Sequence, residues 1–587
     1  MESQNQSRRH FLKATSATAA AGAAVGLGIG TNVSASQFDH LPALYPPKDR
    51  SFLPAGALPP LAFRVFHKLG FGPKPGDIDA FNALGATDDA RLNNWLELQL
   101  FPTNVDPEVD SRVNGNANFV TLNQTLTQLW TTYELYEGER AYQVRQRPLY
   151  EVESLTLTRM LHSQWQLREM LADFWHNHFN VDGRETGVRS TMTQYDRDVV
   201  RPFIFGNFRA MLEANARSTA MLFYLDNRVN STPNPNENYG RELLELHTLG
   251  AVENYYGFIP PAQVPNNGDG QPSGYVEEDV LELARLLTGF GVNDGENSAP
   301  NTGTFLFRPE RHDDGVKTVV GLDIQGTGES ELGVVLDHLA SHRGTAEFIC
   351  WKLAVRLIGD SFSASDTLIQ QAATVFQDNW QANNQLELVY RTLILSNEFK
   401  TRWTDKAKRP VEVVIAAMRA AESSYTFQPR QRTDVVLAAD RNGLLNLFND
   451  TGQALFVYEP PTGYPEDRGI WQGAGPLIQS WRAITRFFRE DDDDNNLYAN
   501  VAETTNAMLA PALRTPNDIV DAWLDRIYGF TIPAAKRNAM VGLVAQGADP
   551  ALEITADTTN TTNNSDYQRR IRGLVELITM SPEFMTR

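Results

Sequence analysis

The sequence predicts a mainly α-helical protein: a large multi-helix globular domain with a small β-hairpin insertion. Apolar residues recur at helical spacing in most segments from Leu61 onward. Strand-like segments are few, and Thr304–Gly326, with "DDG" at its turn, is the best hairpin candidate. With 587 residues, of which 42% are hydrophobic, the chain can bury a large core.

Helical segments follow a Pro-rich linker at residues 36–60. They are "LAFRVFHKLGFGPKPGDIDAFNALG" (two helices around a Gly/Pro loop), "ARLNNWLELQL", "PLYEVESLTLTRMLHSQWQLREMLADFWHNHF", "DRDVVRPFIFGNFRAMLEANA" and "EEDVLELARLLTGF". Surface loops are expected at Gly291–Gly303 and at the acidic run Glu490–Asn496, where weak calcium binding is the alternative. We assign residues 61–455 to a helical core and 456–587 to a C-terminal helical portion of the same domain.

A short element occurs twice. "LILSNEFKTR" (Leu393–Arg402) resembles "LITMSPEFMTR" (Leu577–Arg587), and each copy ends an amphipathic helix. The element is either a repeated way of ending a helix or the trace of an ancient duplication, and two copies so far apart do not make a solenoid.

The first residues carry an export signal. "SRRHFLK" (Ser7–Lys13) pairs two arginines with Phe–Leu, a weakly apolar Ala/Gly-rich stretch follows, and "VSA" (Val33–Ala35) offers a cleavage site. We therefore predict a twin-arginine signal peptide at residues 1–35, the twin-arginine translocase as partner during export, and a periplasmic or secreted location. The apolar stretch is too weak and too short for a membrane span, so no stable membrane anchor is expected.

Charge and cysteine content narrow the function classes. The formal net charge of -20 argues against nucleic acid and anionic membranes as partners, because these need positive patches. One cysteine, Cys350, rules out internal disulfides and zinc–thiolate or iron–sulfur sites, and its apolar surroundings predict a packed core residue. The sequence contains no GxSxG elbow, P-loop, GxGxxG at a strand–helix junction or CxxCH motif.

The segment "NPNENYGRELLELHTLG" (Asn234–Gly250) concentrates polar groups in one predicted amphipathic helix. Asn234 is the expected N-cap, Pro235 fits the first helical position, and Gly250 is the expected C-terminal end. The polar residues that share one face at about 100° per residue are Asn238, Arg241, Glu242 and Glu245. His247 lies beside the apolar face instead, so a site that uses it together with these carboxylates needs groups from elsewhere in the chain.

Three other segments supply such groups. They are "DFWHNHFNVDG" (Asp173–Gly183), "RHDDGVK" (Arg311–Lys317) and "YVEEDVLELARLLTGF" (Tyr275–Phe290). The candidate catalytic residues are His178, Glu242, Glu245, His247, His312 and Asp313. The candidate structural or orienting residues are Asn177, Asn238, Arg241, Asp279, Arg285 and Lys317. We expect at least two of the three histidines to share one pocket, with Arg241 bracing the carboxylates.

Two interpretations of this constellation stay open. Neutral imidazoles with carboxylates suit a divalent metal (Zn, Mn or Fe(II)), although no spacing such as HExxH requires one, and without a metal they suit acid–base chemistry. Alternatively, the histidines are hydrogen-bonded core residues, and pairs such as Arg241–Glu245 and Arg285–Glu282 are buried braces.

The succession of motifs resembles the bacterial domain-of-unknown-function family 1800 (DUF1800). The motifs are "KLGFGPKPGDIDAF", "FWHNHFNV", "AMLFYLDN", "NPNENYGRELLELHTLG", "GYVEEDVLELARLLTGF", "FRPERHDDGVKTVVG", "KRPVEVVIAAMRAA" and "PPTGYP". The family usually has tryptophan at Phe290 and GWP at Gly463–Tyr464–Pro465. The resemblance implies an exported, largely helical protein, often encoded beside a second exported family that resembles alkaline phosphatases and sulfatases. It places the family's polar signature on Asn177, His178, Asn236, Glu237, Asn238, Arg241, Glu242, Glu245, His247, Asp279, Arg285, Thr288, His312, Asp313 and Lys317.

Two functions are therefore expected. One is an exported enzyme with metal-assisted or acid–base hydrolase-like activity on an extracellular polymer or its fragments. The other is a non-catalytic scaffold or partner of a neighbouring exported phosphatase/sulfatase-like protein. An enzyme needs an open cleft with perturbed titratable groups, whereas a scaffold buries these groups in satisfied pairs and exposes an apolar patch elsewhere.

Overall fold

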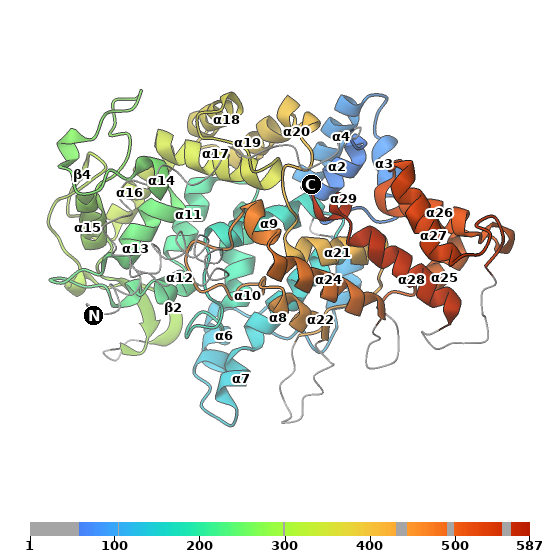
Figure 1. Cartoon of the computed structure of the whole chain (residues 1–587). Helices are drawn as coiled ribbons and strands as arrows, with labels where there is room; N and C mark the ends of the chain where they lie inside the picture. The colour runs from blue at the N-terminus through green and yellow to red at the C-terminus, as the bar shows by residue number, and fades with distance from the viewer. Residues whose placement is uncertain (1–57, 104, 297–299, 430–442, 490–497, 555–564) are drawn as a thin grey trace, which may run out of the picture. The chain divides into compact units, whose positions relative to one another are not determined.

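Helices make up most of the described structure, which confirms the mainly α class (Figure 1). The computed structural model describes residues 58–103, 105–296, 300–429, 443–489, 498–554 and 565–587. The predicted signal peptide, most of the predicted linker and the acidic run Glu490–Asn496 lie outside the described residues. Leu58–Arg587 form one compact unit. In the described part of the chain, no helix is both long and apolar enough to span a membrane.

The helices before the first strand follow the predicted segments. They are α2 (Leu61–Lys68), α3 (Asp77–Asn82), α4 (Asp88–Leu100), α5 (Pro107–Val113), α6 (Leu126–Leu129), η3 (Trp130–Glu134), α7 (Ala141–Arg145), α8 (Arg147–His162), α9 (Gln166–His178), α10 (Met192–Gln194), η4 (Tyr195–Val200), η5 (Arg201–Phe203), α11 (Phe208–Ala216), α12 (Thr219–Tyr224), η6 (Asn227–Val229), α13 (Glu237–Glu242), η7 (Leu243–His247), α14 (Ala251–Asn254), η8 (Pro261–Gln263) and α15 (Glu277–Leu286). The long predicted helix around residue 163 is two helices, because the backbone of Ser163 is extended between α8 and α9.

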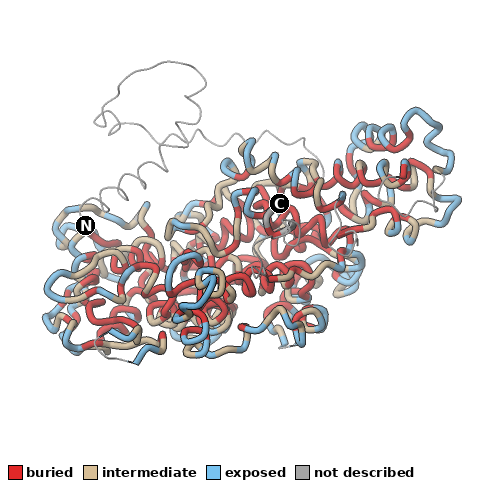
Figure 2. Tube along the Cα trace, turned by 90° about the horizontal axis from the view of Figure 1, so that it is seen from below, coloured by how far each residue is buried: buried red, intermediate tan, exposed pale blue. Residues whose placement is uncertain are grey.

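The helices after the strands form the second part of the same unit. They are η10 (Pro309–Arg311), α16 (Ser330–Ser341), α17 (Arg343–Leu357), α18 (Thr367–Asp378), α19 (Gln385–Ile394), α20 (Asn397–Thr401), α21 (Pro410–Ala420), α22 (Gly443–Asp450), α23 (Arg468–Trp471), α24 (Ala474–Arg489), α25 (Val501–Met508), η11 (Pro511–Leu513), α26 (Pro516–Tyr528), α27 (Ala534–Ala545), α28 (Asp566–Thr579) and α29 (Pro582–Met585). Buried residues run through all of these layers as a core (Figure 2). Cys350 is completely buried on α17, as predicted.

The β structure differs in detail from the predicted hairpin. Strand β1 (Phe290–Asp294) pairs antiparallel with β2 (Asn301–Phe307), and β3 (Lys317–Val319) pairs with β4 (Leu322–Ile324). The prediction that Thr304–Gly326 is one hairpin around "DDG" is therefore wrong. The prediction of a loop at Gly291–Gly303 is wrong at both of its ends, where residues lie in β1 and β2. The cross-strand packing of Phe290 against Phe305 and Phe307 stabilises this pairing and has no local sequence signature.

The repeated element begins a short helix in both copies. Ser396 is the N-cap of α20 and Ser581 is the N-cap of α29: their hydroxyl oxygens accept hydrogen bonds from the backbone N–H groups of Phe399 and Phe584, and both phenylalanines are buried. Each copy also follows three helices, α17–α19 in one case and α26–α28 in the other.

Candidate functional site

Helix α9 has a polar face, as predicted, and the side chains of this face bind residues of distant segments. Asp173 pairs with Arg356, at 2.7 Å from its Nη2, and with Arg409. Asn177 binds the backbone of Tyr464 twice, since its Nδ2 donates to the carbonyl at 2.8 Å and its Oδ1 accepts from the N–H at 2.6 Å. The cavity on this face has about 30 Å³, which suits a few water molecules at most.

Asp173 belongs to a buried ion cluster that joins distant parts of the chain. The members of this cluster are Asp173, Arg356, Arg409, Glu412, Glu466 and Arg587. Arg356, Arg409 and Arg587 are almost completely buried. Burial alone would raise the pKa of Glu412, but the guanidinium groups of Arg356, Arg587 and Arg409 lower it to about 2. The cluster is therefore charged at neutral pH, with acids and bases in contact.

His178 and His247 lie together on the apolar side of α9. The Nε2–H of His178 donates to the backbone carbonyl of His247 at 3.2 Å, and the ring centroids are 6.2 Å apart. Burial lowers the pKa of both imidazoles, that of His247 to about 3. Because the carbonyl can only accept, the Nδ1 of His178 keeps its lone pair, and it lies 2.9 Å from Nζ of Lys352 on α17.

The helix that carries His247 is not the regular helix that the sequence predicts. Its N-cap is Asn236, whose side chain accepts from the N–H of Asn238, and not Asn234. Helix α13 ends at Glu242 and continues as the π-helix η7 up to His247. A π turn contains more residues than an α turn, so the faces drawn at 100° per residue shift after Glu242. His247 consequently points into the core, and Leu246 is only half-buried.

The carboxylates of this segment lie in another environment. Arg241 holds Glu277 of α15 in a two-pronged ion pair, with Nη2–Oε1 at 2.6 Å and Nη1–Oε2 at 3.1 Å, and also contacts Glu237 at 3.3 Å. The expected bracing by Arg241 thus goes chiefly to Glu277. Burial raises the pKa of Glu245, and the nearby Arg241 opposes this. Glu242 is buried, and Asn238 donates to the carbonyl of Leu225 at 3.0 Å.

His312 belongs to a third, fully enclosed network. Its Nδ1 lies 2.8 Å from the carbonyl of Thr288, its Nε2 lies 3.0 Å from Oε1 of Glu331, and Nζ of Lys317 lies 2.7 Å from the other oxygen of Glu331. Burial opposes the charged imidazole, but these two hydrogen bonds raise the pKa of His312. Glu331, on α16, was not among the predicted residues.

Asp313 and Asp279 hold neighbouring segments in place. Asp313 forms a two-pronged pair with Arg285, both contacts at 3.0 Å, and these hydrogen bonds lower the pKa of Asp313 to about 2. Arg285 also pairs with Glu282, as the brace interpretation expects. Asp279 accepts from the N–H of Val276 and from that of Val320, so it caps α15 and fixes the β3–β4 turn.

Two of the three predicted histidines therefore meet. His178 and His247 share ring and hydrogen-bond contacts, whereas the ring of His312 contacts a different set of residues. Within the described residues, no three or more histidine, cysteine, aspartate or glutamate side chains are placed to hold a metal ion. None of the three histidines lines any of four cavities in the described structure. Each of these cavities has one of the following residues in its wall: Asn177, Val252, Asp269 or Val320.

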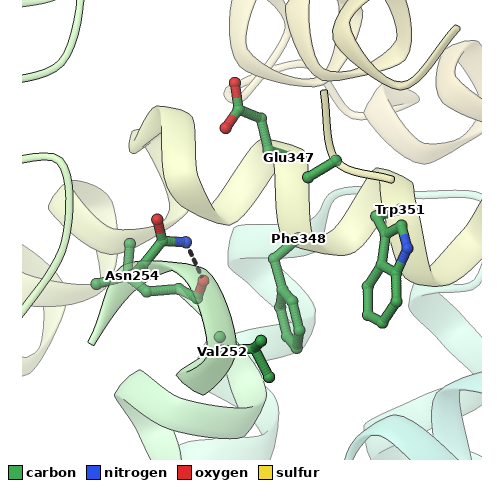
Figure 3. Close-up of a pocket in the computed structure, with 8 residues that line it drawn as sticks. Val252, Asn254, Glu347, Phe348 and Trp351 are labelled. Carbon is green, nitrogen blue, oxygen red and sulfur yellow. Dashed lines mark hydrogen bonds between the residues drawn. The ribbon is translucent and has the colours of Figure 1, made fainter. Parts of the chain in front are cut away.

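The surface between α14 and α17 carries a pocket that the predicted residues do not line. It has about 110 Å³, and its walls are mostly apolar: Leu249, Gly250, Val252, Asn254, Glu347, Phe348, Trp351 and Ala364. Val252 lies on one side, and Phe348 and Trp351 lie on the other (Figure 3). A polar pocket of about 360 Å³ shares Asn254 and Glu347 with it.

Sequence reasoning missed this surface and also missed two cations of α17, Lys352 and Arg356. A signal was present for the cations, because Lys352 and Arg356 stand four residues apart in the otherwise apolar run of α17. Val252 is 96% exposed and Phe258, in the segment after α14, is 81% exposed. Their exposure cannot be read from the sequence, where "AVENYYGFIPP" has no helical or strand period.

The fold and these sites define a mainly α-helical protein whose polar motif residues are built largely into its interior. The chain belongs to the family described as "Protein of unknown function (DUF1800)", whose model matches residues 64–586. No curated protein and no solved structure matches the chain. The match covers nearly all of the chain, and the family resemblance of the motifs is confirmed.

Proposed function

We propose that the protein works outside the cytoplasm as a binding partner of another exported protein, and that its polar motif residues are braces. The support for the bracing role is their pairing: Asp173, Arg241, Arg285 and Asp313 all hold oppositely charged side chains of other segments. Removal of one partner from such a pair leaves an unpaired charge and destabilises the fold, so the pairs have a structural role that needs no substrate.

The binding surface that we propose is the α14 surface, defined as Val252 and the apolar pocket that it lines. The observation that carries the proposal is the exposure of Val252 (96%) in the wall of a pocket that Phe348 and Trp351 also line. Exposed apolar residues that gather around a pocket mark interaction sites, whereas scattered ones need no explanation.

The dimensions of the surface favour a protein as its occupant. A pocket of about 110 Å³ is smaller than a typical small-molecule site and is close to the size that holds one benzene ring. It therefore suits one apolar side chain. The adjoining polar pocket, with Arg343, Asp269 and Gln377 in its walls, offers hydrogen bonds to the residues around that side chain. An apolar centre beside a polar rim is the usual composition of a protein interface.

The partner that we propose is the phosphatase/sulfatase-like exported protein encoded beside members of this family. Titration calorimetry with the two purified full-length proteins tests this. Val252→Asp puts a charge at the apolar centre and is expected to weaken binding at least tenfold, about 1.4 kcal/mol. Val105→Asp is the matched control, because Val105 is also exposed (58%) and does not line the pocket. No binding by the unmodified pair, or equal binding by both variants, would refute the proposal.

A hydrolase-like acid–base activity is the second candidate, and one observation favours it. The Glu245 carboxyl has a raised pKa and lies near Arg241 and Glu277, which is the environment of a general acid. If this carboxyl is catalytic, Glu245→Gln abolishes hydrolysis of a polysaccharide or peptide substrate while the melting temperature stays within about 1 °C of that of the unmodified protein, since Glu245 is only half-buried.

Export by the twin-arginine route is part of the proposal. It rests on the "SRRHFLK" motif of the sequence. Replacing Arg8 and Arg9 with lysines is expected to leave the protein in the cytoplasm, which cell fractionation would measure. Unchanged export of this variant would mean that another route carries the chain.

A further inference from the structure

The polar pocket that shares Asn254 and Glu347 with the apolar one has no apolar side chain in its wall. It has about 360 Å³, which lies within the range of about 300–1,000 Å³ for small-molecule sites. The walls of such sites are mostly apolar with a few polar groups, whereas every residue in the wall of this pocket is polar or glycine. The pocket therefore suits a ligand that is polar on all sides.

Hydrogen bonds between segments fix the wall of this polar pocket. Asp269 belongs to the loop after η8, and its Oδ2 accepts from Nε2 of Gln377 on α18 at 2.8 Å. On α17, Nε of Arg343 donates to Oε1 of Glu347 at 2.8 Å. The Oδ1 of Asn267 accepts from the N–H of Asp269 at 2.9 Å. Because the wall is formed before a ligand arrives, binding costs little additional conformational entropy.

The same hydrogen bonds leave several wall groups with an unused atom. Among the described residues, Oε2 of Glu347, Oδ1 of Asp269 and Oε1 of Gln377 have no hydrogen-bond partner. The Nδ2 of Asn267 is buried and is also without a partner in the described part of the chain. A buried amide without an acceptor requires an explanation, and a ligand oxygen supplies one. The wall thus offers both acceptors and a donor.

The charges around the polar pocket disfavour an ionic ligand. The carboxylates of Asp269 and Glu347 repel an anion. A cation is disfavoured by the guanidinium of Arg343 and by the N-terminus of α17, where Arg343 lies. This guanidinium is also engaged by Thr374 at 3.1 Å and by Gln370 at 2.6 Å, so few of its donors remain for an anion. A neutral ligand fits these charges best.

We propose that the polar pocket binds a neutral sugar. Each hydroxyl group of a sugar ring can donate one hydrogen bond and accept others, so one ring satisfies both kinds of wall group. The carboxylates of Asp269 and Glu347 accept from hydroxyl groups, and the amide of Asn267 donates to one. The loop residues Gly268 and Asp269 are exposed, so a sugar reaches the pocket from solvent. This site goes beyond partner binding, because Val252 does not lie in its wall.

Titration calorimetry of the full-length protein with three neutral probes tests the proposal. The probes are cellotetraose, maltotetraose and N-acetylated chitotetraose. We expect at least one of them to bind with a Kd of about 1 mM or lower. This Kd should be the same at about 50 and about 500 mM sodium chloride, because salt does not screen the binding of a neutral ligand.

A pocket-filling variant and a matched control locate the binding site. Gly268→Met adds a long side chain in the wall of the polar pocket, at a position where a Cβ meets open space, and should weaken sugar binding at least about tenfold. Gly542→Met is the control, because a Cβ there also meets open space and Gly542 does not line the pocket. Equal melting temperatures of the two variants would show that both fold.

Three results would overturn the proposal: no binding of any of the three probes, the same Kd for Gly268→Met and Gly542→Met, or tighter and salt-sensitive binding of spermidine or sulfate, which would define an ionic site. The sugar titration is separate from the partner titration, because it uses the protein alone. Val252→Asp should keep the sugar Kd while it weakens partner binding, so either proposal can fail without the other.

Discussion

Replacing Glu412 with glutamine tests whether the buried ion cluster stabilises the fold. The Oε1 of Glu412 lies 2.5 Å from Nη1 of Arg356, and its Oε2 lies 3.2 Å from Nε of Arg587. Glu412→Gln keeps the shape and removes the charge, so the buried guanidinium groups lose a shared counter-ion. Removal of one partner from a buried pair costs about 3–5 kcal/mol.

The pKa of Glu412 gives a second route to the same magnitude. It is about 2 in the folded protein and 4.5 without the protein environment. A difference of about 2.5 units at 1.36 kcal/mol per unit corresponds to about 3 kcal/mol. The sign follows from the lowered pKa: this stability is fully present above pH 4.5 and is lost as the pH falls towards 2.

Thermal unfolding at pH 7 measures the effect. For the unit of about 530 residues, Leu58–Arg587, the entropy of unfolding is about 1.1 kcal/mol per degree, so a loss of about 3–5 kcal/mol lowers the melting temperature by about 3–5 °C. Glu97→Gln is the control, because Glu97 also pairs with an arginine, Arg391, but is 43% exposed. Its expected shift is below about 1 °C. Equal shifts for the two variants would refute the reasoning.

Three further predictions concern other parts of the structure. The pKa of His312 is raised in the folded protein, so its protonated form stabilises the fold. This contribution is complete below pH 6.5 and is lost as the pH rises through the raised pKa. His312→Asn should therefore remove part of the pH dependence of urea unfolding between about pH 6 and 8. Gly240→Ala on α13 places a methyl group about 3.0 Å from the backbone nitrogen of Ala284 and should lower the free energy of unfolding by about 1–3 kcal/mol. Gly542→Ala on α27 meets open space and should raise it by up to about 1 kcal/mol. Urea unfolding midpoints measure both changes. Burial raises the pKa of the Cys350 thiol, so it should react with a thiol reagent only after unfolding, and fast reaction in the native state would contradict its place in the core.

The helical fold could be predicted because its signal is local. Segments such as α4 and α15 repeat apolar residues at a spacing of three to four, and these apolar positions are largely the ones that are buried. Strand pairing is not local in this sense. Residues 291–303 look like a polar loop, yet β1 and β2 form there because Phe290 packs against Phe305 and Phe307 across the pair.

The sequence did not predict the long-range partners of the candidate residues. At least two of the three histidines were expected to share one pocket; the rings of His178 and His247 are 6.2 Å apart, but neither lines a described cavity, and the π turn after Glu242 was not foreseen. The partner of Arg241 is 36 residues away, on another helix, and that of Asp173 is 183 residues away. Sequence spacing reports neighbours within one helix, so it suggested Arg241–Glu245 and could not suggest Arg241–Glu277.

The long range of these contacts fits the export route that the sequence predicts. The buried ion cluster joins α9, α17, α21, the segment at Glu466 and Arg587, so it cannot form before residue 587 has been synthesised. A partly folded chain would bury some of these charges without their partners, at several kcal/mol for each ion, and this strongly favours completion of the whole cluster. A route that carries proteins already folded allows the cluster to form before export, whereas a route that threads an unfolded chain would require it to form afterwards. An ion cluster that needs residues from Asp173 to Arg587 therefore agrees with the export route that the motif at Ser7–Lys13 predicts.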